Sequence, residues 1–254
     1  MSAGSRQRVA SVARALTLLD EVARSDARLG VNELARRIGV NASTASRLLA
    51  TLEEGGLVER SADGPYRLGL KLVALSDRVL GQLDVRERAR PWLTWLVEET
   101  GETATLSVPG GGEAITVDFV PSSSSVVSMA RVGRPSVAHA TAAGKVMLAF
   151  GVSGGGGGTE GDLMAYTERT ITDRAALAAE LEAVRTSGIA EAVGEREPDL
   201  NALAAPVIGR GGELVAILGL QGPAARLPAS TRRALHAPLR RASSELGRSL
   251  GGAG

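Results

Sequence analysis

The sequence contains no cysteine, two histidines and few aromatic residues, and each scarcity excludes a kind of site. Without cysteine there is no disulfide, no thiol nucleophile and no cysteine-bound metal, which fits a reducing compartment. His139 and His236 lie far apart in the chain, so a zinc or iron site is not expected. Aromatic residues make up only 2% of the chain, so we expect a core built from Leu, Val, Ala and Ile.

Long hydrophobic runs are also missing. No stretch approaches the 18 or so consecutive apolar residues that a transmembrane helix needs. The first eight residues are polar and basic, and no apolar segment of a signal peptide follows them. We therefore expect a cytoplasmic protein without a membrane partner. Its 254 residues are enough for one large domain or two small ones.

Net charge is small, but it is unevenly distributed. The 29 basic and 28 acidic residues give +1, which by itself says nothing about partners. Residues 1–80 hold 12 basic and 9 acidic residues, a net of +3, and residues 81–254 hold 17 and 19, a net of −2. A basic N-terminal part on an acidic body has the sign expected of DNA binding, although a solvated surface gives the same asymmetry.

Hydrophobic spacing in the first 70 residues predicts three helices followed by a hairpin. The helices are expected at 9–24, 33–38 and 43–54, and β-like segments at 57–60 and 66–68. An Asp-Gly turn joins the two β-like segments. This order of elements is typical of a winged helix-turn-helix, which binds DNA.

Caps and apolar faces support these helices. Asn32 is expected to be the N-cap of the second helix. The third is expected to end at Gly55-Gly56, because glycine adopts the left-handed C-cap conformation at little cost. The residues expected to face inward from the first and third helices are Val12, Leu16, Leu19, Val22, Ala45, Leu48, Leu49 and Leu52.

Beyond residue 70 the pattern changes to a mixture of helices and strands. Residues 71–100 are expected to be helical with a break at 81–84, so the first part is interpreted as a linker helix. Strands are predicted at 103–108, 114–120, 126–132, 202–208 and 213–220, and helices at 141–150, 173–186 and 228–250. Helices on a mainly antiparallel sheet indicate an α+β domain of the sensor type. The five glycines at 154–158 are interpreted as a flexible loop.

The third helix carries the strongest candidate site. If its apolar residues face inward, its polar side chains project outward, and a helix presented in this way fits the major groove. Arg47 can bind guanine bidentately or a phosphate, whereas the short hydroxyls usually contact phosphate or cap the helix. Taken singly, Ser43 could be only an N-cap and Arg47 only a solvated side chain. The candidate DNA-binding residues, including two arginines of the hairpin, are Asn32, Ser43, Thr44, Ser46, Arg47, Thr51, Arg60 and Arg67.

Several segments resemble the IclR family of bacterial regulators. In the N-terminal part they are SVARALTLLDEVARS, VNELARRIGVNASTASRLLATLEEGGLVER and YRLGLKLVALS, and in the body HATAAGKVMLAF, LAAELEAVRTSGIA and LNALAAPVIGRGGELVAILGLQGP. The resemblance implies a winged helix-turn-helix at 1–70, a linker helix at 71–83 and a GAF-like effector-binding and oligomerisation domain at 84–254. It further implies a homodimer or a homotetramer.

The resemblance also implies a cavity for a small metabolite, such as an organic or aromatic acid, in the C-terminal domain. Helix N-terminal amides near Ala142 to Lys145 would suit a carboxylate. Family members that sense small oxo-acids have an acidic residue near Ala192 and hydroxyls at the positions of Gly219 and Gln221. We therefore expect a roomier, less polar cavity and a larger ligand. The residues carried over to its wall are Ala143, Gly144, Leu200, Ala202, Gly219 and Gln221.

Other motifs have simpler explanations. Gly144-Lys145 lacks the first glycine and the following Ser or Thr of a phosphate-binding loop. His139 is expected to cap or pack, and no serine in a nucleophile-elbow context accompanies either histidine. Glu195 and Glu197 lack a nucleophile or a metal partner. We therefore expect no cofactor, no metal and no enzyme activity.

These observations favour a sequence-specific transcription regulator, either a repressor or an activator. A small-molecule effector is expected to control its affinity for a double-stranded DNA operator. Two alternatives stay open at this point. One is an enzyme whose C-terminal domain turns over a metabolite and uses the N-terminal part for docking. The other is an oligomerisation scaffold that binds no specific DNA.

Overall fold

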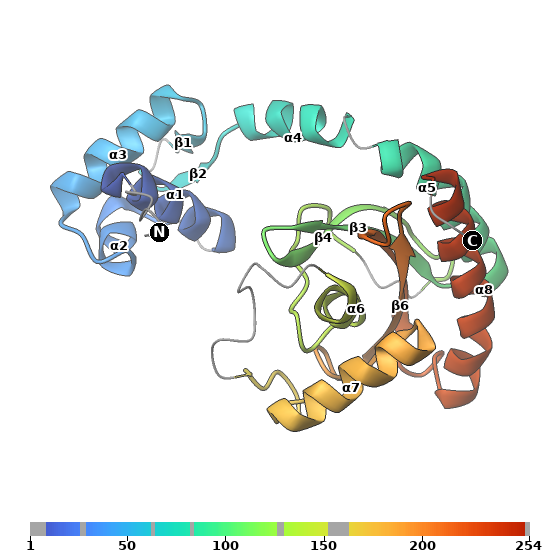
Figure 1. The fold of residues 1–254 in the computed structure, drawn as a ribbon. Helices are drawn as coiled ribbons and strands as arrows, with labels where there is room; N and C mark the ends of the chain where they lie inside the picture. The colour runs from blue at the N-terminus through green and yellow to red at the C-terminus, as the bar shows by residue number, and fades with distance from the viewer. Residues whose placement is uncertain are drawn as a thin grey trace, which may run out of the picture. The chain divides into compact units, whose positions relative to one another are not determined.

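A computed structural model describes most of the chain (Figure 1). The described residues are 9–25, 29–61, 64–81, 84–125, 130–151 and 163–251. The chain divides into two compact units, residues 1–82 and 83–254, and each has a buried apolar cluster of its own. Across these segments, no helix combines the length and the apolar composition that a membrane crossing requires.

The N-terminal unit consists of helices followed by a two-stranded hairpin. Its elements are α1 (Ala10–Arg24), α2 (Val31–Arg37), α3 (Ala42–Glu54), β1 (Val58–Arg60), β2 (Tyr66–Leu68) and α4 (Lys71–Gly81). The two strands are antiparallel, with Val58 opposite Leu68. The predicted order of a winged helix-turn-helix followed by a further helix is therefore confirmed.

The face of α1 that enters the core differs from the prediction. Leu18 and Val22 are buried, whereas Val12 and Leu16 are 55% and 57% exposed. The helix has more apolar positions than this small core can cover, and packing partners on other elements select which of them are buried. Those partners include Leu34 of α2, as well as residues of α3 and the hairpin. Val12 and Leu16 are left as an apolar stripe on the surface.

Two helix starts were also predicted incorrectly. The N-cap of α2 is Gly30, so Asn32 is the second helical residue and is exposed. The N-cap of α3 is Asn41, whose Oδ1 accepts a hydrogen bond from an amide of the first turn at 2.8 Å. Ser43 therefore lies inside the helix with its side chain exposed. At the other end Gly56 adopts the left-handed conformation, with φ +72°, and the predicted glycine stop is confirmed.

The C-terminal unit contains a five-stranded antiparallel sheet in the order β4-β3-β7-β6-β5. In Figure 1, α5 and α8 cover one face of this sheet, and α6 and α7 lie on the other. The predicted α+β class is confirmed. The elements are α5 (Asp84–Thr100), β3 (Thr103–Gly110), β4 (Glu113–Val120), α6 (Ala142–Phe150), α7 (Arg174–Ser187), β5 (Ala190–Val193), β6 (Leu200–Ile208), β7 (Leu214–Pro223) and α8 (Ala229–Ser249).

Two sheet predictions need correction. The strand expected at 126–132 falls partly outside the described residues, and Ala130 to Val132 are not in a strand. The chain instead follows the outer edge of β4, where the Gly133 amide donates to the Thr116 carbonyl at 2.7 Å. The strand β5 was not predicted, because four residues are too few for a clear alternation. The glycine run at 154–158 lies outside the described residues.

The cores are aliphatic, as the scarcity of aromatic residues predicts. Leucine, valine, isoleucine and alanine account for every buried hydrophobic residue of the described chain except Tyr66. On the α6 side of the sheet the buried residues are mostly small, including Ala142 of α6, Ala190 and Ala192 of β5 and Ala204 of β6. Small residues on facing elements let α6 approach the sheet closely.

Candidate DNA-binding surface and effector cavity

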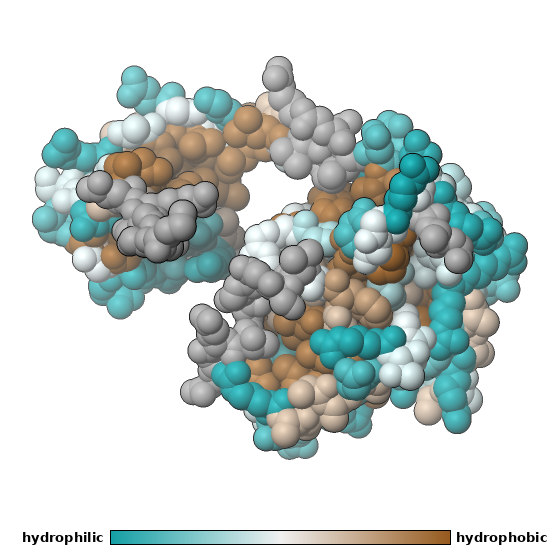
Figure 2. Space-filling view, in the orientation of Figure 1, coloured by the Kyte–Doolittle hydropathy of each residue, from teal (hydrophilic) through white to brown (hydrophobic). Residues whose placement is uncertain are grey.

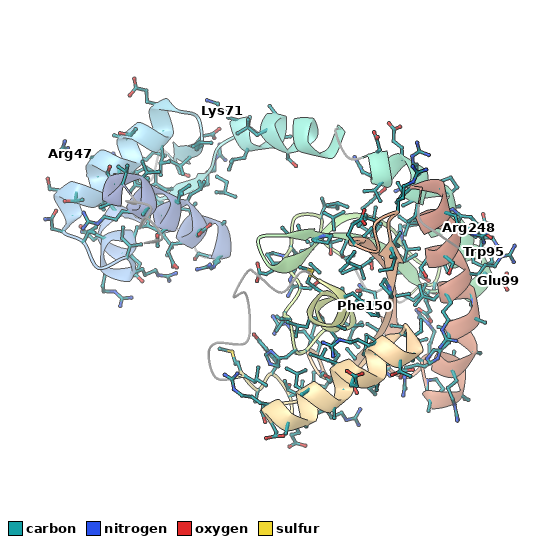
Figure 3. The ribbon with its side chains drawn as sticks, in the orientation of Figure 1. Arg47, Lys71, Trp95, Glu99, Phe150 and Arg248 are labelled. Atoms are coloured by element: carbon teal, nitrogen blue, oxygen red, sulfur yellow. The ribbon has the colours of Figure 1, made fainter. Side chains whose placement is uncertain are left out.

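Helix α3 presents a polar face to solvent because its apolar residues enter the core. Ala45, Leu49 and Leu52 are buried, as predicted, and Leu48 is partly buried. On the opposite side Arg47 is exposed and projects outward from the helix (Figure 3). No carboxylate pairs with the Arg47 guanidinium within the part of the chain that the structure describes.

The other α3 candidates differ in how available their side chains are. Ser43 and Ser46 are exposed, and Thr44 is half-buried. The Thr51 hydroxyl donates to the Arg47 carbonyl of its own helix at 3.1 Å, so its hydrogen is already engaged. The first two turns of α3 thus carry the more available polar groups.

The hairpin arginines are held by neighbouring groups. Arg67 donates from Nε and Nη2 to Oε2 of Glu59, at 3.1 and 2.9 Å. These hydrogen bonds, followed by one from the Leu70 amide, hold the pKa of Glu59 below its usual value. Arg60 donates to the Gly64 carbonyl at 3.3 Å, and its guanidinium lies 6.0 Å from the centre of the Tyr66 ring.

The C-terminal unit contains a cavity of about 370 Å³ between its sheet and the N-terminal end of α6. The strand register shows which residues lie side by side on the floor of this cavity. Thr105 of β3 lies opposite Gly219 of β7, which in turn lies opposite Ala204 of β6. One step along, Gln221 pairs with Ala202, which pairs with Ala192 of β5. Glycine and alanine leave space above the strands that larger side chains would fill.

Gly219 is required at its position by a close approach. A Cβ placed there would lie 2.5 Å from Oγ1 of Thr105, so any side chain would displace that threonine from the cavity floor. The absence of a side chain at Gly219 therefore both deepens the cavity and keeps a hydroxyl at its wall.

The first turn of α6 forms another wall. Thr141 is the N-cap, and its Oγ1 accepts from the amide of Gly144 at 3.1 Å. Ala142 and Ala143 line the cavity, and their amides have no hydrogen-bond partner among the described residues. Unpaired amides and the positive end of the helix dipole favour an anionic group at this wall.

Five of the six residues carried over from the family line this one cavity: Ala143, Leu200, Ala202, Gly219 and Gln221. Gly144 does not line it. A Cβ on Gly144 would lie 2.5 Å from the carbonyl oxygen of Val137, so this glycine allows the helix to pack against the preceding segment. Whether the five contact an effector stays a prediction.

The expectation of a cavity roomier and less polar than that of oxo-acid sensors stays a prediction. Although Ala192, Gly219 and Gln221 carry a methyl group, a hydrogen and an amide, other lining residues supply polar groups that the sequence analysis missed. They are Thr105, Ser107, Thr116, Arg131, Arg134, Ser136, Thr141, Arg196 and Glu197. Alternating Thr and Ser in residues 103–107 could have indicated the hydroxyls, but no local signal marks the arginines.

Lys145 has a structural role beside the cavity. Its side chain is 1% exposed, and Nζ lies 2.8 Å from Oε1 of Glu195 and 3.1 Å from Oε1 of Glu180. It also donates to the Glu191 carbonyl at 2.8 Å. Glu195, expected to be without a nucleophile or metal partner, is therefore half of a buried ion pair. Among the described residues, no group of acidic side chains and histidines is arranged to hold a metal ion.

Two family models match the chain along most of its length. The IclR helix-turn-helix domain matches residues 11–62, and the bacterial transcriptional regulator IclR C-terminal domain matches residues 77–248. The chain belongs to the IclR family. It is therefore a transcription regulator with an N-terminal DNA-binding domain and a C-terminal effector-binding domain, which confirms the function predicted from the sequence.

Individual relatives of this IclR-family chain agree with that assignment. It is 31% identical to the HTH-type transcriptional regulator XynR of Escherichia coli K12, over 96% of this chain and 98% of that protein. The crystal structure of an IclR-type protein from Silicibacter has a TM-score of 0.82 at 29% identity, covering 96% and 97% of the two chains. An IclR homologue from Microbacterium hydrocarbonoxydans, complexed with 4-hydroxybenzoate, shares the fold with a TM-score of 0.75 at 24% identity, covering 95% and 99%.

Proposed function

We propose that this regulator inserts α3 into the major groove of an operator and that a carboxylate effector in the C-terminal cavity changes its operator affinity. The observation that carries the proposal is the exposed polar face of α3, centred on Arg47, on a helix whose other face is locked in the core. A rigid helix with an unpaired arginine is suited to base readout.

Each candidate residue has a separate proposed role on the DNA. Arg47 would bind guanine, and Ser43, Thr44 and Ser46 would bind phosphate or base edges. The remaining candidates fit positions at the edge of the interface. Asn32 at the start of α2, Thr51 at the second half of α3, and Arg60 and Arg67 of the hairpin would contact the DNA backbone.

We further propose that the protein acts as a homodimer or homotetramer in the cytoplasm. Large apolar side chains are exposed on the N-terminal unit, among them Leu16 of α1 and, on or beside α4, Leu70 (76%) and Val73 (58%). The apolar surface near α4 is visible in Figure 2. Burial of such side chains against a second copy would favour dimerisation, and a dimer would match a two-fold symmetric operator.

We also propose a division of roles along the chain. Residues 1–70 would bind DNA, residues 71–83 would form a linker helix, and residues 84–254 would bind the effector and form the oligomer.

The effector is proposed to be an organic acid. Its carboxylate would accept hydrogen bonds from the amides of Ala142 and Ala143 at the N-terminus of α6. An effector that binds two arrangements of the dimer with different affinity shifts the population between them, and operator affinity changes accordingly.

Fluorescence anisotropy with the DNA upstream of its own gene, in the presence of random-sequence competitor, tests the proposal. We expect tight binding that resists competitor and falls with added salt. Arg240→Ala is a matched control for Arg47→Ala, because Arg240 is an exposed arginine of α8 in the other unit. Binding no stronger than to random DNA across several neighbouring promoter fragments would refute operator recognition and favour a scaffold.

A further inference from the structure

We infer that the effector is an elongated aliphatic hydroxy- or oxo-acid, with its polar end over β3 and β4 and its hydrocarbon end over β6 and β5. This inference rests on the proposed function and deepens it, because it assigns a chemical class and an orientation to the ligand. It follows from how polar and apolar groups are divided across the cavity floor.

The β3 and β4 side of the floor carries hydroxyl groups. Thr105 and Ser107 are two residues apart on β3 and so share a face, and Ser107 pairs with Thr116 of β4. The hydroxyl oxygens of Ser107 and Thr116 are 3.4 Å apart, longer than a strong O–H···O hydrogen bond. The Thr105 hydroxyl has no hydrogen-bond partner among the described residues. These hydroxyls are therefore available to a ligand oxygen.

The positive charge of the cavity lies at the same side. The segment that carries Arg131 and Arg134 runs along the outer edge of β4, where the Thr116 amide donates to the Arg134 carbonyl at 3.3 Å. Both arginines line the cavity, and neither has an ion-pair partner in the described part of the chain. A carboxylate between these guanidinium groups and the N-terminus of α6 would be stabilised by both.

The β6 and β5 side of the floor is apolar. Ala202 and Ala204 of β6 and Ala192 of β5 present only methyl groups there. Beyond them Arg196 and Glu197 carry opposite charges, so this end has no net charge. The Arg196 guanidinium also lies 4.1 Å from the centre of the Tyr166 ring, which holds it by a cation–π contact.

The dimensions and lining disfavour a flat aromatic ligand. From β4 to β5 the sheet spans four strand spacings, which is about 19 Å. None of the described residues that line the cavity is aromatic, so none of them offers a ring face for stacking. A flexible chain with one polar end uses such a shape better than a compact ring does.

Isothermal titration calorimetry of the full chain with four acids tests the inference. The probes are hexanoate, 2-hydroxyhexanoate, 2-oxohexanoate and 4-hydroxybenzoate. We expect the hydroxy- or the oxo-acid to bind at least about tenfold more tightly than hexanoate, the factor that one hydrogen bond contributes. Thr116→Val should bring that ratio close to one, whereas Thr186→Val, a threonine of α7 outside the cavity, should leave it unchanged.

The orientation is tested separately by filling the apolar side. Ala202→Leu should weaken binding of 2-hydroxyhexanoate but not of 2-hydroxypropanoate, whose chain is too short to reach β6. The matched control is Ala178→Leu on the exposed side of α7. Equal losses for both acids, or no loss, would overturn the orientation. Circular dichroism of each variant verifies that it folds.

Three results overturn the chemical class. They are equal binding of hexanoate and its hydroxylated and oxidised forms, tighter binding of 4-hydroxybenzoate, and no binding of any probe at 10 mM, a concentration far above typical metabolite affinities. Operator binding is measured on the same preparation with and without each acid. If hexanoate releases the operator at the same concentrations as its hydroxy and oxo forms, or 4-hydroxybenzoate does so at lower ones, the proposed function stands and only this inference fails. If no operator is bound, the proposed function fails.

Discussion

The two units of this protein treat polar groups in opposite ways. Within the described residues, every buried polar or charged side chain belongs to the C-terminal unit, including Lys145, Glu195 and Asp118. The N-terminal unit keeps its ion pairs on the surface, as between Glu33 and Arg36. Most of the large apolar side chains that are exposed in the described residues also belong to this unit. A DNA-binding unit acts through its outer surface, whereas an effector domain needs polar groups inside.

The largest effect is expected from breaking the buried ion pair of the C-terminal unit. Lys145→Met should leave the Glu195 carboxylate buried without its cation and destabilise this unit by about 3–5 kcal/mol. Urea unfolding followed by tryptophan fluorescence measures this, because both tryptophans, Trp92 and Trp95, lie in α5.

The matched variants sharpen the comparison between buried and surface pairs. Adding Glu195→Gln to Lys145→Met should recover part of the loss, because no buried charge is then left unpaired. Arg36→Met, at the surface pair with Glu33, should change stability by at most about 0.5 kcal/mol. A loss for Lys145→Met as small as that of Arg36→Met would contradict a structural role for the buried pair.

The next largest effect concerns the DNA-binding surface. Arg47→Ala should weaken operator binding by about 1–3 kcal/mol while leaving the stability of the N-terminal unit unchanged, because the side chain is exposed. Anisotropy titrations with operator and random DNA separate two explanations. A selective loss on the operator indicates guanine readout, and an equal loss on both DNAs would make Arg47 a phosphate contact.

A smaller effect is expected at the exposed apolar stripe of α1. Leu16→Asp should weaken self-association by roughly tenfold, because a charge would be placed in the proposed contact between copies. Sedimentation at several concentrations measures the dissociation constant. Leu18→Asp is the contrasting variant, since Leu18 is fully buried and its replacement should unfold the unit. An unchanged dissociation constant for Leu16→Asp would exclude α1 from the contact.

The smallest effect is a pH dependence on the N-terminal surface. Hydrogen bonds from Arg36 and Arg37 lower the pKa of Glu33 from 4.5 to about 2. A lowered folded-state pKa stabilises the protein above pH 4.5, and that contribution is lost as the pH falls towards 2. The melting temperatures of wild type and Glu33→Gln should therefore differ slightly at pH 6 and converge near pH 2.5. A constant difference would show that ionisation of Glu33 does not matter.

In the N-terminal unit, features that depend on neighbours in the chain were predicted correctly, whereas a feature that depends on packing between elements was not. Helix stops such as Gly56 and the spacing of Ala45, Leu49 and Leu52 depend on neighbours in the chain, and they placed α3 to within a residue at its start. The rotation of α1 was missed because partners on α2, α3 and the hairpin determine which of its apolar stripes is buried.

The cavity was predicted only where the family resemblance supplied positions. Thr105, Thr116 and Arg131 come from separate segments, and only the register of β3, β4 and the segment beside it brings them to one wall. Alternation along one strand shows which of its residues share a face, but the sequence does not show which residues of separate strands become neighbours. Residues such as Ala202, by contrast, matched a continuous stretch of the family pattern.

The floor of glycine and alanine has a consequence for evolution. Ala202 lines the cavity and is only partly buried, so a larger side chain there would extend into the cavity while its backbone stays fixed by strand pairing. Single-codon changes at such a site can resize the cavity without rebuilding the sheet or the helix-turn-helix of the other unit. A lineage of such regulators could therefore change the nutrient it senses while it continues to control the same genes.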